Sequence, residues 1–368
     1  MIYFDHNATT PLDERVLQEM LPFLGQLYGN PSSLHRLGRI TRSAIDQARE
    51  RVASLVNARA ENIIFTSGGT EANNLVLNRF AATDTIVTSI IEHASILEVC
   101  SASAAHTQFI DVSASGYLNP KSLFDTLGAS SIPFASLMWV NNETGVIQDI
   151  AQLTQQLKVH GALVHTDAVQ ALGKIALDFQ AADVDFMSLS SHKIYGPKGC
   201  GALVCKNPEQ LTPLLQGGGQ ESGWRAGTEN VAAIVGFGKA AELAQLELLA
   251  RQAHTQILRE RLEAALNSME GLQIFAQNSR RISNTVQFGV QGCVGEMLLM
   301  QLDKKGIAVS SGSACASEEE RGSHVLDAMH IAPDLIQSAI RVSLGQQNTA
   351  QEIDFFVQSL QQIIANNR

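Results

Sequence analysis

The chain has 368 residues, of which 45% are apolar and 17% charged, and its formal net charge is −10. This length and apolar content allow a large buried core and favour two domains over one. Because Lys and Arg form no block, the charge excludes a polyanion-binding surface, and we expect no nucleic-acid partner. No apolar stretch is long enough to cross a membrane, and strand-like sequence from Ile2 leaves no room for a signal peptide, so we expect a soluble cytosolic protein.

The first predicted helix starts at Thr10, where Thr10, Pro11 and Asp13 have the pattern of an N-cap, a first-turn proline and an acidic third residue. Apolar, β-branched runs then alternate with helical patterns. The predicted strands lie at residues 63–65, 86–87, 137–140, 163–164, 186–189 and 201–204. This alternation predicts an α/β fold with crossover connections and a mainly parallel sheet.

A Gly-rich stretch at residues 217–227 precedes a helical pattern over about 229–266, which suits one or two helices. We place a domain boundary inside it, with a large domain over residues 14–247 and a small domain over 1–13 and 248–368. The small domain has mixed strand and helix patterns, a loop at 310–323 and a final amphipathic helix near 353–364.

Polar residues follow the predicted strands where each strand ends. Segments 67–70, 141–143 and 190–193 and Asp167 all occupy such positions. In open α/β sheets ligands bind beyond the carboxyl ends of the strands, so these residues should meet in one cleft.

Gly69 and Thr70 belong to a turn of small residues, 67–70, between a predicted strand and a predicted helix. Backbone N–H groups and a hydroxyl at a positive helix terminus are typical of a phosphate site. A tight turn with an ordinary N-cap explains the same residues without a ligand.

Asp167 follows a buried strand, so its carboxylate needs a cationic partner such as a protonated pyridine nitrogen, although a helix N-cap would also suit it. Lys193 lies between hydroxyl-bearing residues, His192 and a glycine-rich turn. These neighbours are not typical of a solvent-exposed surface lysine. Such a lysine can lose its proton and form a Schiff base with an aldehyde. A phosphate cradle, an acid and this lysine together predict pyridoxal phosphate as the cofactor.

His93 follows another predicted strand. Its ring could stack on the cofactor or transfer protons, or the residue could be purely structural.

The five cysteines, at positions 100, 200, 205, 293 and 315, form no C-x-x-C pair, which argues against a disulfide framework or a metal knuckle. Four lie in apolar or strand-like surroundings that are typical of inert buried thiols. Cys315 instead lies among small and charged residues at 310–323. We interpret it as an accessible catalytic thiol that can travel between a buried site and an outside acceptor.

At this point the sequence resembles the cysteine desulfurases of the NifS and IscS type, within the class-V aminotransferases. The matching motifs cover nearly the whole chain, at residues 5–11, 29–33, 66–71, 140–145, 190–199, 225–228, 310–315 and 341–345. The resemblance implies a fold-type I enzyme that binds pyridoxal phosphate, with a seven-stranded sheet in the large domain. It also implies a homodimer that converts L-cysteine to alanine, leaves a persulfide on Cys315 and passes the sulfur to an iron–sulfur scaffold or tRNA-thiolation protein.

The resemblance also implies a role for each site residue. Lys193 would bind the cofactor aldehyde, Asp167 the ring nitrogen and Gln170 the ring hydroxyl, while His93 stacks and handles protons. The other roles are the phosphate for Gly69, Thr70, Ser190 and His192, the partner subunit's phosphate for Thr228, and the substrate carboxylate for Asn142 and Arg341.

Two features depart from the family pattern. Ser222 stands where relatives commonly place a basic residue, and the chain ends at Arg368, whereas many scaffold-binding relatives continue into a tail that contacts the scaffold. The resemblance therefore leaves open whether this chain docks to such a scaffold. The acidic run at 318–320 would alter which sulfur-acceptor protein the enzyme binds, or is simply part of a solvated loop.

Two other classes of protein share parts of this pattern. An aminotransferase of the same fold would use Lys193, Asp167 and the phosphate cradle in the same way, and Cys315 separates the two reactions. A partner subunit without catalysis would need a broken site, whereas Lys193, His93, Asp167 and Cys315 are all present.

Overall fold

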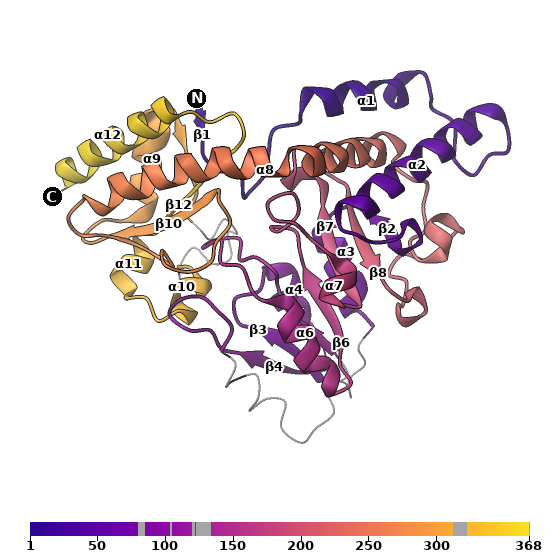
Figure 1. Cartoon of the computed structure of the whole chain (residues 1–368), viewed down its shortest axis with the longest axis horizontal. Helices are drawn as coiled ribbons and strands as arrows, with labels where there is room; N and C mark the ends of the chain where they lie inside the picture. The colour runs from indigo at the N-terminus through magenta and orange to yellow at the C-terminus, as the bar shows by residue number, and fades with distance from the viewer. Residues whose placement is uncertain (80–84, 104, 120–121, 123–133, 312–321, 368) are drawn as a thin grey trace.

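The largest sheet of the computed structural model has seven strands in the order β2-β8-β7-β6-β5-β3-β4 (Figure 1). The structure describes residues 1–79, 85–103, 105–119, 122, 134–311 and 322–367. The strands are β2 (Ile63–Thr66), β3 (Thr85–Ser89), β4 (His106–Ile110), β5 (Phe134–Ser136), β6 (Leu163–Asp167), β7 (Phe186–Ser190) and β8 (Gly201–Cys205). Within this sheet β8 runs antiparallel to both neighbours and the other pairs are parallel, so the predicted mainly parallel sheet is confirmed.

Helices cover both faces of this sheet, because its strands are apolar on both sides. In β2, for example, Ile63 and Phe65 pack into one core cluster and Ile64 into another. The first cluster is completed by α1 (Glu14–Gly25), α2 (Arg36–Leu55), α6 (Ile150–Val159), α7 (Phe179–Ala182) and the N-terminal half of α8 (Val231–Asn267). The second is completed by α3 (Gly69–Leu77) and α4 (Ala94–Ala102).

The C-terminal part is built on a three-stranded antiparallel sheet, β12-β10-β9, and a short parallel pair, β1-β11. Its strands are β1 (Ile2–Tyr3), β9 (Leu272–Ile274), β10 (Thr285–Val290), β11 (Ile307–Ala308) and β12 (Ile340–Ser343). Its helices are α9 (Gly295–Lys304), α10 (His324–Ala328), α11 (Pro333–Gln337) and α12 (Ala350–Asn367). A third core cluster holds Phe4 together with apolar residues from Leu258 to Ile364, so the N-terminal segment packs with the C-terminal part.

A single helix, α8, joins the two parts and crosses the top of the molecule in Figure 1. Its first turns are buried almost all round, from Ala232 to Ala244, whereas further on burial is confined to Thr255, Leu258, Leu262 and Leu266, a stripe at helical spacing. The predicted helical segment is therefore one helix. None of the described helices is long and apolar enough to span a bilayer.

Two expectations about elements were wrong. Helix α1 begins at Glu14, with Asp13 rather than Thr10 as its N-cap. The Thr10 hydroxyl instead donates to the carbonyl of His192 and accepts from the N–H of Tyr195. Because tertiary contacts use this hydroxyl, it does not cap the helix as the local sequence pattern predicts.

The strand predicted at residues 137–140 lies three residues earlier, as β5. Residues 137–140 still run alongside β6, because the N–H groups of Leu137 and Trp139 donate to the carbonyls of His165 and Asp167. The chain has left the regular ladder there, and Asn142, just beyond this segment, lines the cavity described below.

Candidate active site

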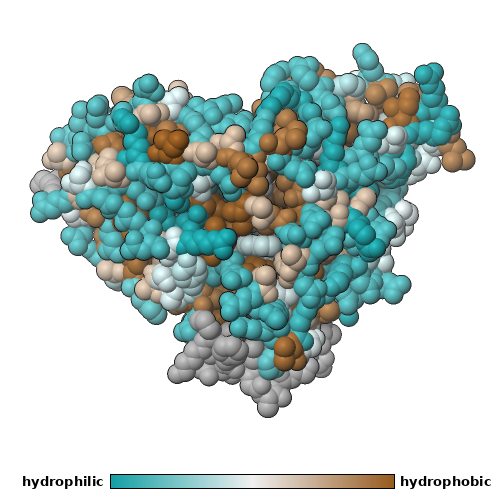
Figure 2. All heavy atoms as spheres, in the orientation of Figure 1, coloured by the Kyte–Doolittle hydropathy of each residue, from teal (hydrophilic) through white to brown (hydrophobic). Residues whose placement is uncertain are grey.

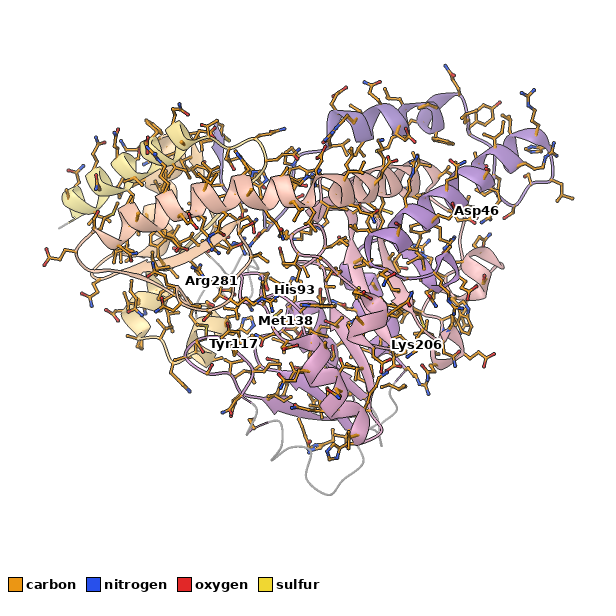
Figure 3. All side chains as sticks on the ribbon, in the orientation of Figure 1. Asp46, His93, Tyr117, Met138, Lys206 and Arg281 are labelled. Atoms are coloured by element: carbon orange, nitrogen blue, oxygen red, sulfur yellow. The ribbon has the colours of Figure 1, made fainter. Side chains whose placement is uncertain are left out.

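A cavity of about 330 Å³ lies beyond the carboxyl ends of β2, β6 and β7 and is closed on its other side by the C-terminal part. It brings together all but two of the predicted site residues: Gly69, Thr70, His93, Asn142, Asp167, Gln170, Ser190, His192, Lys193 and Arg341. Figure 3 labels His93 and Met138, both lining residues, in the middle of the molecule, and Figure 2 shows apolar side chains exposed in this central region.

The two remaining residues are not in the cavity wall. Thr228 is exposed in the loop before α8, and Cys315 lies outside the described residues. The other four cysteines are all buried, as expected. Burial raises the pKa of Cys100 to about 11 and that of Cys205 to about 12, which keeps both thiols protonated and inert.

Lys193 ends a 3₁₀ turn, Ser191–Lys193, that directly follows β7. Its Nζ donates to the backbone carbonyls of Asn7 and Ala8, at 2.5 and 2.8 Å. Burial, and next the nearby guanidinium of Arg341, lower the pKa of Lys193 to about 8. A substantial fraction of this amine is therefore neutral near pH 8, as a nucleophile that attacks an aldehyde must be.

Asp167, the last residue of β6, is joined to His93 through two intermediate side chains. Asn73 Nδ2 donates to Asp167 Oδ2 and to Ser95 Oγ, both at 2.8 Å, and Ser95 Oγ lies 2.8 Å from His93 Nδ1. Because the Ser95 N–H also donates to His93 Nδ1, that nitrogen is an acceptor, and the ring carries a proton on Nε2. The network fixes a carboxylate and an imidazole in one wall.

Part of the cavity, at its end near α3, is suited to receive an anion. Helix α3 begins at Gly69, so its first N–H groups face the cavity, and Ser190 Oγ is buried with no hydrogen-bond partner among the described residues. A side chain at position 69 would collide with Val169 Cγ2, because a Cβ there would lie 2.7 Å from it. His192, whose pKa burial lowers to about 4, lines the same end as a neutral ring.

Arg341 reaches the cavity from β12, and its side chain is only 3% exposed. Its Nη2 donates to Asp5 Oδ1 at 2.8 Å and its Nη1 to the carbonyl of Asn142 at 3.0 Å. Its Nε has no partner among the described residues. On β12 the backbone of Arg341 also pairs with Ser310, which precedes the segment that contains Cys315.

Several cavity residues were missed from the sequence, namely Asn7, Asn73, Ser95 and His324. Asn7 contacts the most partners. Its carbonyl accepts from Lys193 and Gln170, and its side-chain amide donates to the carbonyl of Asn142 and to Thr285. Asn7 belongs to a recognised motif at 5–11, but no spacing rule assigns it a partner 278 residues away.

The aminotransferase class-V family matches residues 2–356 of the chain. The cysteine desulfurase IscS of Dictyoglomus turgidum is 39% identical over 100% of this chain and 95% of its own length, and the cysteine desulfurase of Cereibacter sphaeroides is 41% identical over 99% and 95%. The solved NifS-like protein of Rickettsia africae superposes with a TM-score of 0.92 at 35% identity and 99% coverage of both chains. The solved complex of SspA with cysteine has a TM-score of 0.81 at 29% identity and covers 95% of this chain and all of that one.

An open, mainly parallel sheet, a lysine with a lowered pKa, a carboxylate and an anion cradle at the strand ends define a fold-type I pyridoxal-phosphate enzyme. The chain belongs to the class-V aminotransferase family and, within it, to the cysteine desulfurases. The residues present fit the cofactor, since the partnerless Ser190 hydroxyl and the start of α3 match its phosphate and Lys193 its aldehyde.

Proposed function

We propose that this enzyme takes sulfur from L-cysteine, releases L-alanine and holds the sulfur as a persulfide on Cys315. The observation that carries this is the meeting of Lys193 and Arg341 in one cavity, an amine for an aldehyde cofactor beside a guanidinium for a carboxylate. The relatives are cysteine desulfurases by name, and SspA has been solved with cysteine.

Each side chain has a part in this reaction. Bound pyridoxal phosphate supplies an electron sink for the substrate's carbon atoms. Lys193 would hold the cofactor's aldehyde, Asp167 its ring nitrogen and Gln170 its ring hydroxyl. Gly69, Thr70, Ser190 and His192 would hold its phosphate, and His93 would lie beside the ring and transfer protons.

Arg341, with Asn142, binds the substrate carboxylate, for which a planar guanidinium is suited. The Cys315 thiolate attacks the substrate sulfur and forms an S–S bond while the carbon–sulfur bond breaks. The electron pair of that bond stays with the substrate carbon, which is protonated to become the methyl group of alanine. L-cysteine and one thiol thus give alanine and one persulfide, so the atoms balance.

We further propose a homodimer in which Thr228, exposed before α8, reaches the phosphate of the partner subunit. The domains run over 14–247 and over 1–13 with 248–368. The core cluster of Phe4 with apolar residues between Leu258 and Ile364 supports this division, and Val325, Leu326 and Met329 of the small domain pack into the cluster of the large sheet. The sulfur acceptor is an iron–sulfur scaffold or a tRNA-thiolation protein, and a reducing cytosol suits four free buried thiols and one reactive one.

One assay tests the reaction. The purified yellow protein is incubated with L-cysteine, alanine is quantified, and the modified cysteine is mapped by mass spectrometry. We expect alanine together with one extra sulfur atom on Cys315. Sulfur on a different cysteine, or pyruvate and ammonia in place of alanine, contradicts the proposal.

A further inference from the structure

Lys174 lies behind the cavity wall, in a position that the proposed reaction leaves unused. Its Nζ donates to Asn7 Oδ1 at 3.1 Å and to Gln170 Oε1 at 2.5 Å. Burial lowers its pKa well below the ordinary value, and the nearby charge of Lys193 lowers it further. The structure thus offers the amine two oxygen acceptors, and each of them receives an N–H group.

The turn that carries Lys174 is packed tightly against the turn that carries Lys193. Gly173 has a positive φ of 65°, and a Cβ there would lie 2.7 Å from Ile194 Cγ2. The Lys174 carbonyl also accepts from Gln252 of α8. These contacts hold the Lys174 backbone in place, so its amine is a fixed donor.

The amide of Gln170 is consequently held in one orientation. Its Oε1 is taken by Lys174, and its Nε2 donates one hydrogen to the carbonyl of Asn7 at 2.8 Å. Gln170 also lines the cavity. The group that it can still offer to a ligand is its second N–H, a donor, while its acceptor faces away.

We infer that Lys174 is a positioning residue that orients the Gln170 amide so that the cofactor's ring oxygen meets an N–H group and not a carbonyl. This inference rests on the proposed role of Gln170. An amide released from Lys174 can rotate by 180°, which would place its carbonyl against the oxygen of the ring and replace a hydrogen bond with a repulsion.

The test is a double-variant cycle read by the visible absorption of the holoenzyme as a function of pH, without turnover. Lys174→Met, Gln170→Ala and the double variant are compared with the parent, and Lys206→Met is the control. Lys206 is an exposed lysine paired with Asp183 and is labelled in Figure 3 well away from His93.

We expect Lys174→Met to move the midpoint of the pH titration of the visible absorption band to higher pH by about 0.5–1 unit. A shift of this size is equivalent in free energy to one hydrogen bond. The reason is that an oxygen that loses a donor holds its neighbouring proton more tightly. In the Gln170→Ala background the same substitution should have no further effect, and Lys206→Met should match the parent.

Two results overturn the inference. One is an unmoved midpoint in Lys174→Met, and the other is an equal shift with and without Gln170, which would mean that Lys174 acts through its own charge. If Lys174→Met does not fold, Lys174→Ala removes the same donors without placing an apolar group beside the polar cavity, and the cycle is repeated with it. A parent that shows no visible band would instead refute the proposed cofactor site, so the two failures are distinct.

Discussion

The two sheets contribute to the cavity in different ways. The seven-stranded sheet supplies side chains from several strand ends, among them Asp167 and Lys193, each fixed by hydrogen bonds to neighbours. The three-stranded sheet supplies Arg341 from the middle of a short antiparallel strand. In the proposed reaction the first sheet therefore provides the groups for the cofactor. The second provides the group for the substrate, whose backbone pairs with Ser310, the residue before the segment that contains Cys315. This division predicts that substitutions on the two sheets fail in different ways.

The largest effect is expected for Lys193→Ala on the seven-stranded sheet. This variant should lose the visible absorption band and at least about 10³-fold in alanine production, because no other amine lines the cavity in the part of the chain that the structure describes. The measurements are the absorption spectrum and alanine release. Lys206→Ala is the matched control, and a Lys193→Ala protein that still makes alanine would remove the basis of the cofactor assignment.

Arg341→Gln tests the other sheet. Removing a buried charge from the proposed carboxylate site costs about 2–5 kcal/mol, so kcat/KM for cysteine should fall by roughly 30-fold or more while the visible band is kept. Steady-state kinetics measure the loss of kcat/KM, and the absorption spectrum shows whether the visible band is kept. Arg261→Gln, at an exposed pair with Asp354, should change neither. Loss of the band in Arg341→Gln would contradict the division between the sheets.

Ser95→Ala should have a smaller effect, since it removes one link between His93 and Asn73 but leaves the cofactor groups in place. We expect kcat to fall about tenfold, the equivalent of one hydrogen bond in a buried network. The pH profile of kcat should also move, because the His93 ring loses its hydrogen-bonded connection through Ser95 Oγ to Asn73 and Asp167. An unchanged pH profile would show that the network is only structural.

The smallest effect is a pH dependence in the loading of the apoprotein with pyridoxal phosphate. With the pKa of Lys193 lowered to about 8, the neutral fraction of the amine rises from about one half at pH 8 to about nine tenths at pH 9. The initial loading rate should then rise about twofold over that interval. A lysine at its ordinary pKa would give about a tenfold rise, and stopped-flow absorbance distinguishes the two.

The sequence predicted the parts of the site that are local in the chain. Gly69, Asp167 and Lys193 each follow a strand, so the rule that ligands bind at strand ends was enough to bring them together. It could not predict the groups that hold those residues. Lys174 finds its acceptors on Gln170, four residues away, and on Asn7, 167 residues away.

The errors in the fold have the same origin. Thr10 fits a helix cap by local pattern, but the turn that carries Lys193 takes its hydroxyl. Residues 137–140 are apolar enough for a strand, yet they only run alongside β6 and are not part of its regular ladder. In both places contacts made across the fold overrode a correct local propensity.

The most direct test of the division between the two sheets uses Cys315→Ser and adds L-cysteine to the holoenzyme. The cavity groups are intact in this variant, so the visible spectrum should change as it does in the parent when the substrate binds. Alanine should not be released, because no thiol is present to take the sulfur. An unchanged spectrum, or alanine released at the parent's rate, would contradict the account.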